Sequence, residues 1–205
     1  MLKKAMFPAA LVFGLAALLT GTPVWAQSQC DAVPGNLVTN CGFETGDFTG
    51  WTQGGNTGFT SVTNNPTYVH SGNFGAQLGP VGSDGTLSQM VGDNSTTYNI
   101  SFWLENTGGP TNDFTLFWNG VDIGPTLVDA SPFGYTQYSF TENGNLGVGS
   151  NSLEFVFRND PAYWGLDDVV VTNQQAPPIP EPGSLVLLGT GLLGAAGALR
   201  RKFIN

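Results

Sequence analysis

Positive charge is scarce in this sequence. Only 6 of its 205 residues are Lys or Arg, against 15 Asp and Glu. Between residues 27 and 179 the only cation is Arg158, and fourteen acidic residues share that stretch. A nucleic-acid-binding protein needs cations to displace phosphate counterions, so the composition excludes this class of protein. It also predicts that anionic membrane surfaces repel the domain.

Histidine and cysteine are almost as rare. The single histidine is His70, and the two cysteines are Cys30 and Cys41. A zinc site needs several such ligands, so it is not favoured. A Ser-His-Asp or Cys-His catalytic site would have to use His70, whose surroundings, "YVHSG", are equally typical of a surface turn. Carboxylates are numerous instead, and they are the oxygen ligands that a hard cation such as calcium takes.

The N-terminus predicts export. Two lysines precede an apolar run over residues 5–19, and small residues flank Trp25 just before the expected cleavage point. This is the order of a secretory signal peptide, which we expect to be cleaved after Ala26. A retained membrane anchor is the alternative, which the shortness of the apolar run disfavours. In an oxidising compartment Cys30 and Cys41 are expected to form a disulfide, and two free thiols are the alternative.

The chain divides into five expected segments. They are a signal peptide at 1–26, a short leader at 27–35, a globular domain at 36–172, a Pro-rich linker at 173–182 and a C-terminal tail at 183–205. The domain has the size of one folding unit. The linker is expected to be extended and stiff, because it is rich in proline.

The globular domain is predicted to be all-β. Asn119-Gly120 is a strong hairpin signal within residues 113–123. Polar and apolar residues alternate at 98–105, 135–142 and 151–158, and the segment 164–172 is expected to be the closing strand. Weaker strands are expected at 36–39, 59–62, 74–78 and 85–91. No window has the apolar stripe of a helix. About nine strands separated by turns predict a two-sheet β-sandwich.

Three motifs occur in an order that resembles a known fold. They are Phe43, Glu44 and Trp51 within "NLVTNCGFETGDFTGW", then "HSGNFGAQLG" at 70–79, then "LDDV" at 166–169. This order resembles the jelly-roll sandwiches of the galactose-binding-like and carbohydrate-binding-module type, over nearly all of residues 36–172. The resemblance implies a jelly-roll β-sandwich, here flanked by an N-terminal signal helix and a single C-terminal transmembrane helix.

In many sandwiches of this type a structural calcium ion joins the first and last strands. The resemblance implies that Glu44 and Asp167, or its neighbour Asp168, supply carboxylates. It also implies that backbone carbonyls near Ser71 and Gly72 complete the site. Several converging oxygen atoms suit calcium, and the ends of a chain need to be held in place. The alternative is that these carboxylates are ordinary turn and surface groups.

Sugar-binding sandwiches stack pyranose rings on exposed aromatic side chains, while amides and carboxylates orient the hydroxyl groups. The resemblance therefore implies a site for a neutral glycan among four aromatic residues, namely Trp103, Tyr135, Tyr163 and Trp164. Trp103 and Tyr135 are the stronger candidates for exposure. Trp118 alternates with core positions and is expected to be buried, and burial is the alternative for the other rings too.

The C-terminal tail combines three unlike elements. It begins with Pro180, Glu181 and Pro182, continues with seventeen uncharged residues, and ends in a cationic group that includes Arg200 and Arg201. As a helix the uncharged run is ~25 Å long, which makes it a marginal membrane span. The arginines would stay in the cytoplasm, which leaves the domain outside, as the N-terminal signal requires.

This order resembles the PEP-CTERM sorting signal of Gram-negative bacteria. The resemblance implies that the C-terminal helix anchors the chain in the membrane transiently and that an exosortase, a membrane-embedded cysteine peptidase, then cleaves near the motif. It also implies delivery to the cell surface or extracellular matrix, where such proteins accompany exopolysaccharide and biofilm formation. A plain single-pass anchor is the alternative.

These features predict an exported, non-catalytic surface or matrix protein with a structural calcium ion and a glycan as its candidate partner. A dedicated carbohydrate-binding lectin is the second hypothesis. A polysaccharide hydrolase is the third, because glycoside hydrolysis needs only two carboxylates. The spacing of the fourteen acidic residues between residues 27 and 179 does not single out such a pair.

Overall fold

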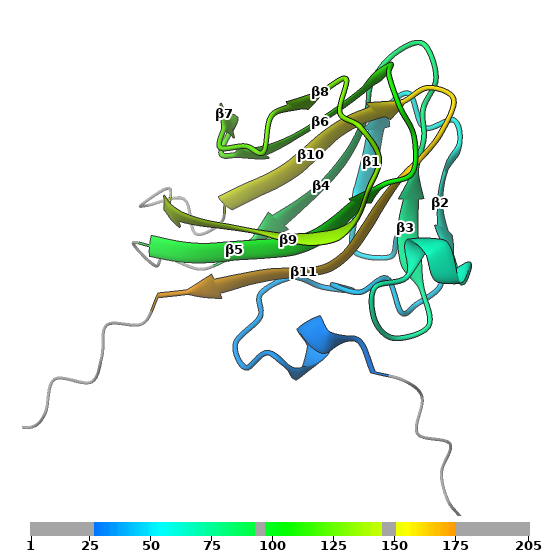
Figure 1. Cartoon of the computed structure of the whole chain (residues 1–205). Coiled ribbons are helices and arrows are strands. Elements are labelled where there is room, and N and C mark those ends of the chain that lie inside the picture. Colours follow the sequence, from blue (N-terminus) through cyan, green and yellow to red (C-terminus); the bar gives the residue numbers. More distant parts are fainter. Residues whose placement is uncertain (1–26, 93–96, 145–150, 175–205) are drawn as a thin grey trace, which may run out of the picture.

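The structure, a computed structural model, describes residues 27–92, 97–144 and 151–174 (Figure 1). The predicted signal peptide and sorting tail lie outside these residues. Within the described ranges, no helix is long and apolar enough to span a membrane. The described chain forms eleven strands and two short 3-10 helices.

The strands are β1 (Thr52–Gly55), β2 (Thr60–Thr63), β3 (Gly75–Leu78), β4 (Gly85–Val91), β5 (Thr97–Asn106), β6 (Asn112–Trp118), β7 (Val121–Asp122), β8 (Leu127–Val128), β9 (Phe133–Asn143), β10 (Asn151–Asn159) and β11 (Trp164–Asn173). The 3-10 helices are η1 (Gln29–Ala32) and η2 (Pro66–Tyr68). In η2 the side chain of Asn65 caps the first turn by accepting the N–H of Thr67.

The strands form two antiparallel sheets that pack face to face (Figure 1). The first sheet has the order β1-β4-β10-β6-β7, and β8 also pairs with β6. The second sheet has the order β2-β3-β11-β5-β9. This arrangement confirms the predicted all-β sandwich, with eleven described strands where the sequence indicated about nine.

The segments with clear alternation are strands close to their predicted bounds. β5, β9 and β10 each contain one of them, and β11 contains the closing strand expected at 164–172. Asn119-Gly120 joins β6 to β7 as the hairpin signal predicts. Two further strands were not expected. β1 has four residues, two of which are glycine, and β8 has only two residues, so neither is long enough to show a pattern.

The strand expected at 36–39 is wrong, although this segment does run beside β11. Leu37 donates its N–H to the carbonyl of Val171 at 2.8 Å, and Val171 donates its N–H to the side-chain oxygen of Asn36 at 3.0 Å. β11 pairs with β3 only over residues 164–166, which leaves the later edge of β11 open to this segment. Because a side-chain amide replaces a backbone partner, no strand ladder forms here.

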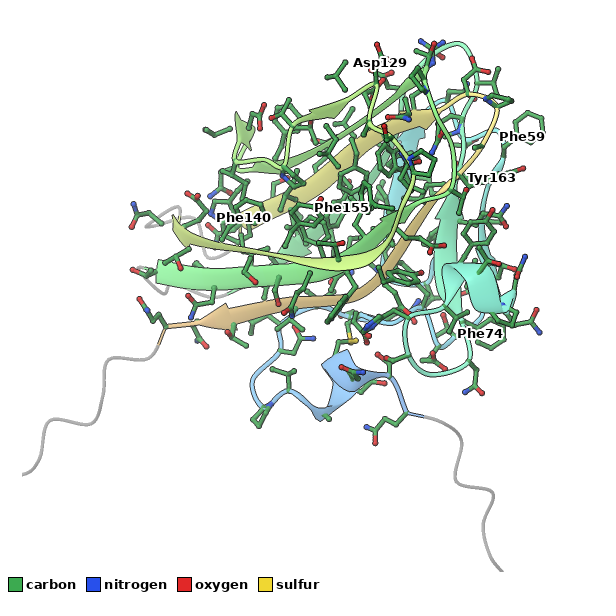
Figure 2. The ribbon with its side chains drawn as sticks, in the orientation of Figure 1. Phe59, Phe74, Asp129, Phe140, Phe155 and Tyr163 are labelled. Carbon is green, nitrogen blue, oxygen red and sulfur yellow. A yellow bond between two sulfur atoms is a disulfide. The ribbon has the colours of Figure 1, made fainter. Side chains whose placement is uncertain are left out.

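The core between the sheets is largely aromatic. Phe155 of β10 lies between the two sheets (Figure 2), and its ring centroid is 5.1 Å from that of Phe102 and 5.7 Å from that of Phe114. All three side chains are fully buried, because alternate positions of each strand face the space between the sheets. Trp118 is only 3% exposed, which confirms its expected burial.

A disulfide fixes the N-terminal segment of the domain. Cys30 and Cys41, which are eleven positions apart in the sequence, are joined, with their Cα atoms 6.0 Å apart. Val169 donates its N–H to the carbonyl of Cys41 at 3.0 Å, so the closed loop is attached to β11. Figure 1 shows this segment, in blue, alongside β11. The beginning and the end of the domain are therefore held together.

Candidate functional site

The outer face of the second sheet carries a shallow groove of about 320 Å³. Its polar lining comes from three adjacent strands: Asn99 and Ser101 of β5, Ser139 and Thr141 of β9, and Thr172 of β11. Val170 adds an outward apolar side chain, whereas Ile100 and Phe140 border the groove at positions whose side chains face the core. The lining side chains offer amides, hydroxyl groups and methyl groups, and none of them carries a charge. A groove of this kind can bind an uncharged, hydroxyl-rich molecule.

Trp103 borders the groove, because it is the next outward position of β5 after Ser101. Its ring stacks on the imidazole of His70, with centroids 3.9 Å apart and planes at 16°. Tyr135 of β9 approaches the same imidazole at 5.2 Å and 62°. The structure therefore brings together the two aromatic residues for which the sequence favoured exposure. Both are half-buried, and His70 covers one face of Trp103.

The other two predicted aromatic residues are adjacent in the chain and differ in burial. Tyr163 is half-buried and packs edge-on against Tyr68 of η2 at 5.7 Å. Trp164 is fully buried and packs on Phe114 of the first sheet at 5.5 Å. The expectation that Trp164 offers its ring to a sugar is wrong, because consecutive residues of a strand face opposite sides and Trp164 takes the inward position.

Asp168 connects three segments of the chain. Its Oδ1 accepts hydrogen bonds from the hydroxyl of Ser28 at 2.6 Å and the N–H of Cys30 at 3.0 Å. Its Oδ2 lies 2.7 Å from Nδ1 of His70 and accepts the hydroxyl of Ser71 at 2.6 Å. Burial opposes ionisation, but the hydrogen bonds from His70, Ser28 and Ser71 outweigh it and lower the pKa of Asp168. An ionised Asp168 therefore joins the leader, the β2–β3 connection and β11.

Asp167 is fully buried next to it. Its Oδ2 accepts the backbone N–H groups of His70 at 2.8 Å and Ser71 at 3.1 Å. Burial, followed by the negative charge of Asp168, raises the pKa of Asp167 to about 8. Two neighbouring carboxyl groups disfavour simultaneous ionisation, so this pair carries fewer charges at neutral pH than its composition suggests.

Glu44 holds the same β2–β3 connection. Its carboxylate accepts the backbone N–H of Asn73 at 2.9 Å and of Phe74 at 3.2 Å. Gly72 has a φ of 75° and passes so close to this carboxylate that a Cβ atom at this position would overlap it. A glycine is therefore required here for two reasons, its backbone conformation and the space that Glu44 occupies.

The acidic residues around this connection are the predicted calcium ligands. Asp31 lies near them, and burial, followed by the charges of Glu44 and Asp168, raises the pKa of Asp31. The donor set of Glu44, Asp167 and Asp168 consists of oxygen atoms, which fits calcium by its chemistry. The contacts of Ser71 are made by its N–H and hydroxyl groups, where the sequence indicated a carbonyl.

A second group of potential ligands is accounted for by the disulfide. Among the described residues, side-chain ligand atoms of Cys30, Asp31 and Cys41 lie within 4.8 Å of one another. Both sulfur atoms are already bonded to each other, so they are not available as the thiolates that zinc requires. This group is therefore a structural cross-link.

Glu105 is a site residue that the sequence did not single out. It is 8% exposed, and burial raises its pKa to about 7. Its Oε1 and the hydroxyl of Tyr135 are both buried, and neither has a hydrogen-bond partner within the part of the chain that the structure describes. Alternation along β5 places Glu105 on the outer face with Trp103, but the sequence gives no sign that other residues cover it.

Two segments of the chain match known families. Residues 35–118 match the family model "Carbohydrate binding domain", and residues 178–202 match the "PEP-CTERM protein-sorting motif". Both matches confirm what the sequence motifs indicated. The sorting motif marks the chain as an exported, surface-directed protein. No curated protein sequence matches the chain.

Solved structures share the fold. TmCBM61, solved in complex with β-1,4-galactotriose, has a TM-score of 0.56 at 21% identity, over 68% of this chain and 99% of that chain. Two weaker likenesses are Family 16 Carbohydrate Binding Module-2 (TM-score 0.49, 17% identity, 67% and 100% coverage) and the CBM22-1 xylan-binding domain of Paenibacillus barcinonensis Xyn10C (TM-score 0.48, 19% identity, 70% and 97% coverage). At this identity the first structure supports the sandwich fold alone.

Proposed function

We propose that this chain is a non-catalytic protein of the cell surface that binds a neutral glycan on the outer face of its second sheet. The observation that carries the proposal is the uncharged polar groove beside Trp103. Sugar hydroxyl groups exchange hydrogen bonds with amide and hydroxyl side chains, and an indole offers a flat apolar face to a sugar ring. All of these groups are present on one open surface.

The charge of the domain favours a neutral ligand over an anionic one. The groove contains no charged side chain, and residues 27–179 have one arginine against fourteen acidic residues. An acidic polysaccharide would be repelled by this surface and would find no cation to pair with. TmCBM61, which shares the fold, was solved with a neutral galactotriose, so neutral β-linked oligosaccharides are the first ligands to test.

The hydrogen bonding of His70 favours binding over catalysis. A nucleophilic serine must hydrogen-bond to the histidine that activates it. Here the hydroxyl of Ser71 donates to Oδ2 of Asp168, the same oxygen that lies next to Nδ1 of His70. Ser71 and His70 therefore share a partner and do not form a nucleophile–base pair.

We propose further that the acidic cluster holds a structural calcium ion. Glu44, Asp167 and Asp168 would hold it, and its positive charge would offset the repulsion between their carboxylates. The raised pKa of Asp167 supports this assignment, because burial and a second carboxyl group disfavour its ionisation when no cation is close. Such an ion would keep the β2–β3 connection on β11.

The sorting motif leads to a proposal for how the protein is anchored, cleaved and released. Family knowledge of the motif implies that an exosortase acts on the tail. We propose that the uncharged helix holds the chain in the membrane of a Gram-negative cell until cleavage, and that the domain is then released to the surface or the exopolysaccharide matrix of a biofilm. Neutral-glycan binding would retain the released domain there.

A binding screen with two variants tests the glycan proposal. The protein would be applied to an array of neutral and acidic glycans, together with Trp103→Ala and Phe117→Ala. Phe117 is a matched control, because it is a half-buried aromatic residue of β6 in the opposite sheet. We expect binding to neutral glycans that Trp103→Ala reduces at least about tenfold and that Phe117→Ala leaves unchanged. An absence of binding to every glycan would reject the proposal.

A further inference from the structure

Two buried polar atoms of the second sheet lie close to Gly165, and neither has a hydrogen-bond partner among the described residues. They are Oε1 of Glu105 and the hydroxyl oxygen of Tyr135. Glu105 belongs to β5 and is 8% exposed, and Tyr135 belongs to β9. Buried polar groups in proteins are normally hydrogen-bonded, so two such atoms beside the groove require an explanation.

Gly165 of β11 faces both atoms. Strand register places Gly165 directly opposite Glu105. A Cβ atom at Gly165 would lie 2.8 Å from the Tyr135 hydroxyl oxygen, 2.8 Å from Cγ of Glu105 and 3.2 Å from its Oε1. Glycine in the interior of a strand often marks a place that another group approaches closely. The absence of a side chain at Gly165 therefore lets Glu105 and Tyr135 pack against the backbone of β11, and their two polar atoms lie close together over it.

His70 lies over this region. Its imidazole is parallel to the indole of Trp103 at 3.9 Å and meets the ring of Tyr135 at 5.2 Å. A flat ring at this distance takes the position in which a pyranose would stack on Trp103. The backbone of His70 is held separately, because its N–H donates to Asp167. The side chain can therefore turn away while the backbone stays in place.

The structure also has room for the displaced ring. A hollow of about 270 Å³ is lined by His70 together with neighbouring residues of the β2–β3 connection, among them Pro66, Val69 and Asn73. Turning the imidazole into it breaks the contact with Oδ2 of Asp168. That oxygen keeps the hydrogen bond from the hydroxyl of Ser71, so the carboxylate is not left without a partner.

We propose that Trp103, Glu105, Tyr135 and Gly165 form a covered sugar subsite next to the groove, and that a neutral sugar displaces His70 from Trp103 to enter it. The sugar ring stacks on Trp103, and its hydroxyl groups give Glu105 and Tyr135 the hydrogen-bond partners that they lack. A neutral Glu105 can both donate and accept, as a sugar hydroxyl can. This inference rests on the glycan-binding function proposed above.

The raised pKa of Glu105 agrees with this role. Burial raises it to about 7, so a large fraction of the side chain is uncharged near neutral pH. The other titratable groups that face this site are Asp167, Asp168 and Tyr68, which act electrostatically on Tyr135, and His70, which packs against it. An uncharged carboxyl group avoids the cost of holding a buried anion against a neutral ligand.

Isothermal titration calorimetry of the full chain with neutral oligosaccharides tests the subsite. The probes are the β-1,4-linked tetrasaccharides of galactose, glucose and xylose. The deciding variants are Glu105→Gln and Tyr135→Phe, because each keeps the shape of the side chain and changes only its polar atoms. Gly165→Ala adds a Cβ atom that pushes Glu105 and Tyr135 out of position, His70→Ala removes the cover, and Phe117→Ala is the control in the opposite sheet. Circular dichroism checks that each variant is folded.

We expect Glu105→Gln, Tyr135→Phe and Gly165→Ala each to weaken binding about tenfold and His70→Ala to strengthen it about threefold, because the sugar no longer competes with the imidazole. If sugars bind and Trp103→Ala abolishes binding, but the two deciding variants bind like the wild type, the subsite is wrong and the glycan-binding function stands. If neither the wild type nor His70→Ala binds any of the probes, the subsite is wrong together with that function.

Discussion

The imidazole of His70 lies flat on the indole of Trp103, with ring centroids 3.9 Å apart and planes at 16°. Nδ1 of the same imidazole is 2.7 Å from Oδ2 of Asp168. Asp168 also binds Ser28 and Cys30 of the leader. The side chain of His70 therefore connects the surface proposed to bind sugar with Asp168, which attaches the leader to β11.

Asp168→Asn is expected to loosen this connection. The amide can no longer accept from all four donors, and two of them, Ser28 and Ser71, lose a charge-assisted hydrogen bond. Breaking a buried charged contact of this kind costs about 3 kcal/mol. Chemical denaturation should therefore give a lower free energy of unfolding, and limited proteolysis should cut the leader sooner. Glu154→Gln, a half-buried carboxylate on the first sheet, is the control and should unfold like the wild type.

Loss of the disulfide should have an effect of similar size. Cys30 and Cys41 are eleven positions apart, and closing a loop of this length stabilises a protein by about 3 kcal/mol in the chain-entropy model. The Cys30→Ser/Cys41→Ser variant and the reduced wild type should unfold at the same, lower denaturant concentration. Unfolding of the reduced wild type at its oxidised midpoint would mean that contacts with β11 hold the loop without the bond.

Much of the fold could be predicted, because the pattern of each long strand reports its two faces directly. Leu153, Phe155 and Phe157 alternate with polar residues and are all fully buried. Residues 36–39 also include apolar side chains, but the side-chain amide of Asn36 accepts the N–H of Val171 and donates to the carbonyl of Val169. A one-dimensional pattern does not report such a contact between distant segments, so the sequence indicated a strand.

The site was less predictable for the same reason. Trp103 and Tyr135 were identified as candidates through the resemblance to sandwiches that stack sugar rings on exposed aromatic side chains. Trp164 was wrongly grouped with them, since its neighbour Tyr163 begins the same short stretch and only the register with Leu78 and Asn106 fixes which of the two faces inward. Glu105 could not be identified, because its burial without a hydrogen-bond partner for Oε1 arises only when β5, β9 and β11 lie side by side.

Stability should fall as pH rises, in part because of Glu105. Burial raises its pKa from 4.5 to about 7, so the folded protein keeps a proton that the unfolded chain releases between these values. The contribution of Glu105 to the free energy of unfolding should therefore decrease from about pH 4.5 to pH 7 and then level off, while that of Asp167 continues to fall to about pH 8. Asp113 and Asp167, whose pKa values burial raises to about 6 and about 8, act in the same direction.

Glu105→Gln separates the contribution of this residue from the others. The amide does not titrate, so the variant should show a shallower decrease over the same pH range, while Asp113 and Asp167 still contribute. Urea denaturation of both proteins at intervals between pH 4.5 and 8 measures the difference. Parallel curves would mean that Glu105 is ionised in the folded protein at the same pH as in the unfolded chain.

Removal of calcium should destabilise the domain if the acidic cluster holds an ion. A chelator would leave Glu44, Asp167 and Asp168 without a counter-charge, so the melting temperature should fall by several degrees, roughly 2–4 °C per kcal/mol for a domain of about this size. Asp167→Asn should have the same melting temperature with and without the chelator. Identical melting curves of the wild type under both conditions would reject a structural ion.

The sorting motif predicts a change of location that depends on three residues. Replacing Pro180, Glu181 and Pro182 by alanine leaves the uncharged run and Arg200 unaltered, so this run can still enter the membrane. The same change removes the element that the exosortase is expected to recognise. The variant should remain uncleaved in the membrane fraction, and mass spectrometry should detect its intact tail. Pro177→Ala lies outside the matched residues 178–202 and should be processed normally. Release of the triple variant at the wild-type rate would show that the exosortase recognises the uncharged run and the arginines after it, and does not require the Pro-Glu-Pro element.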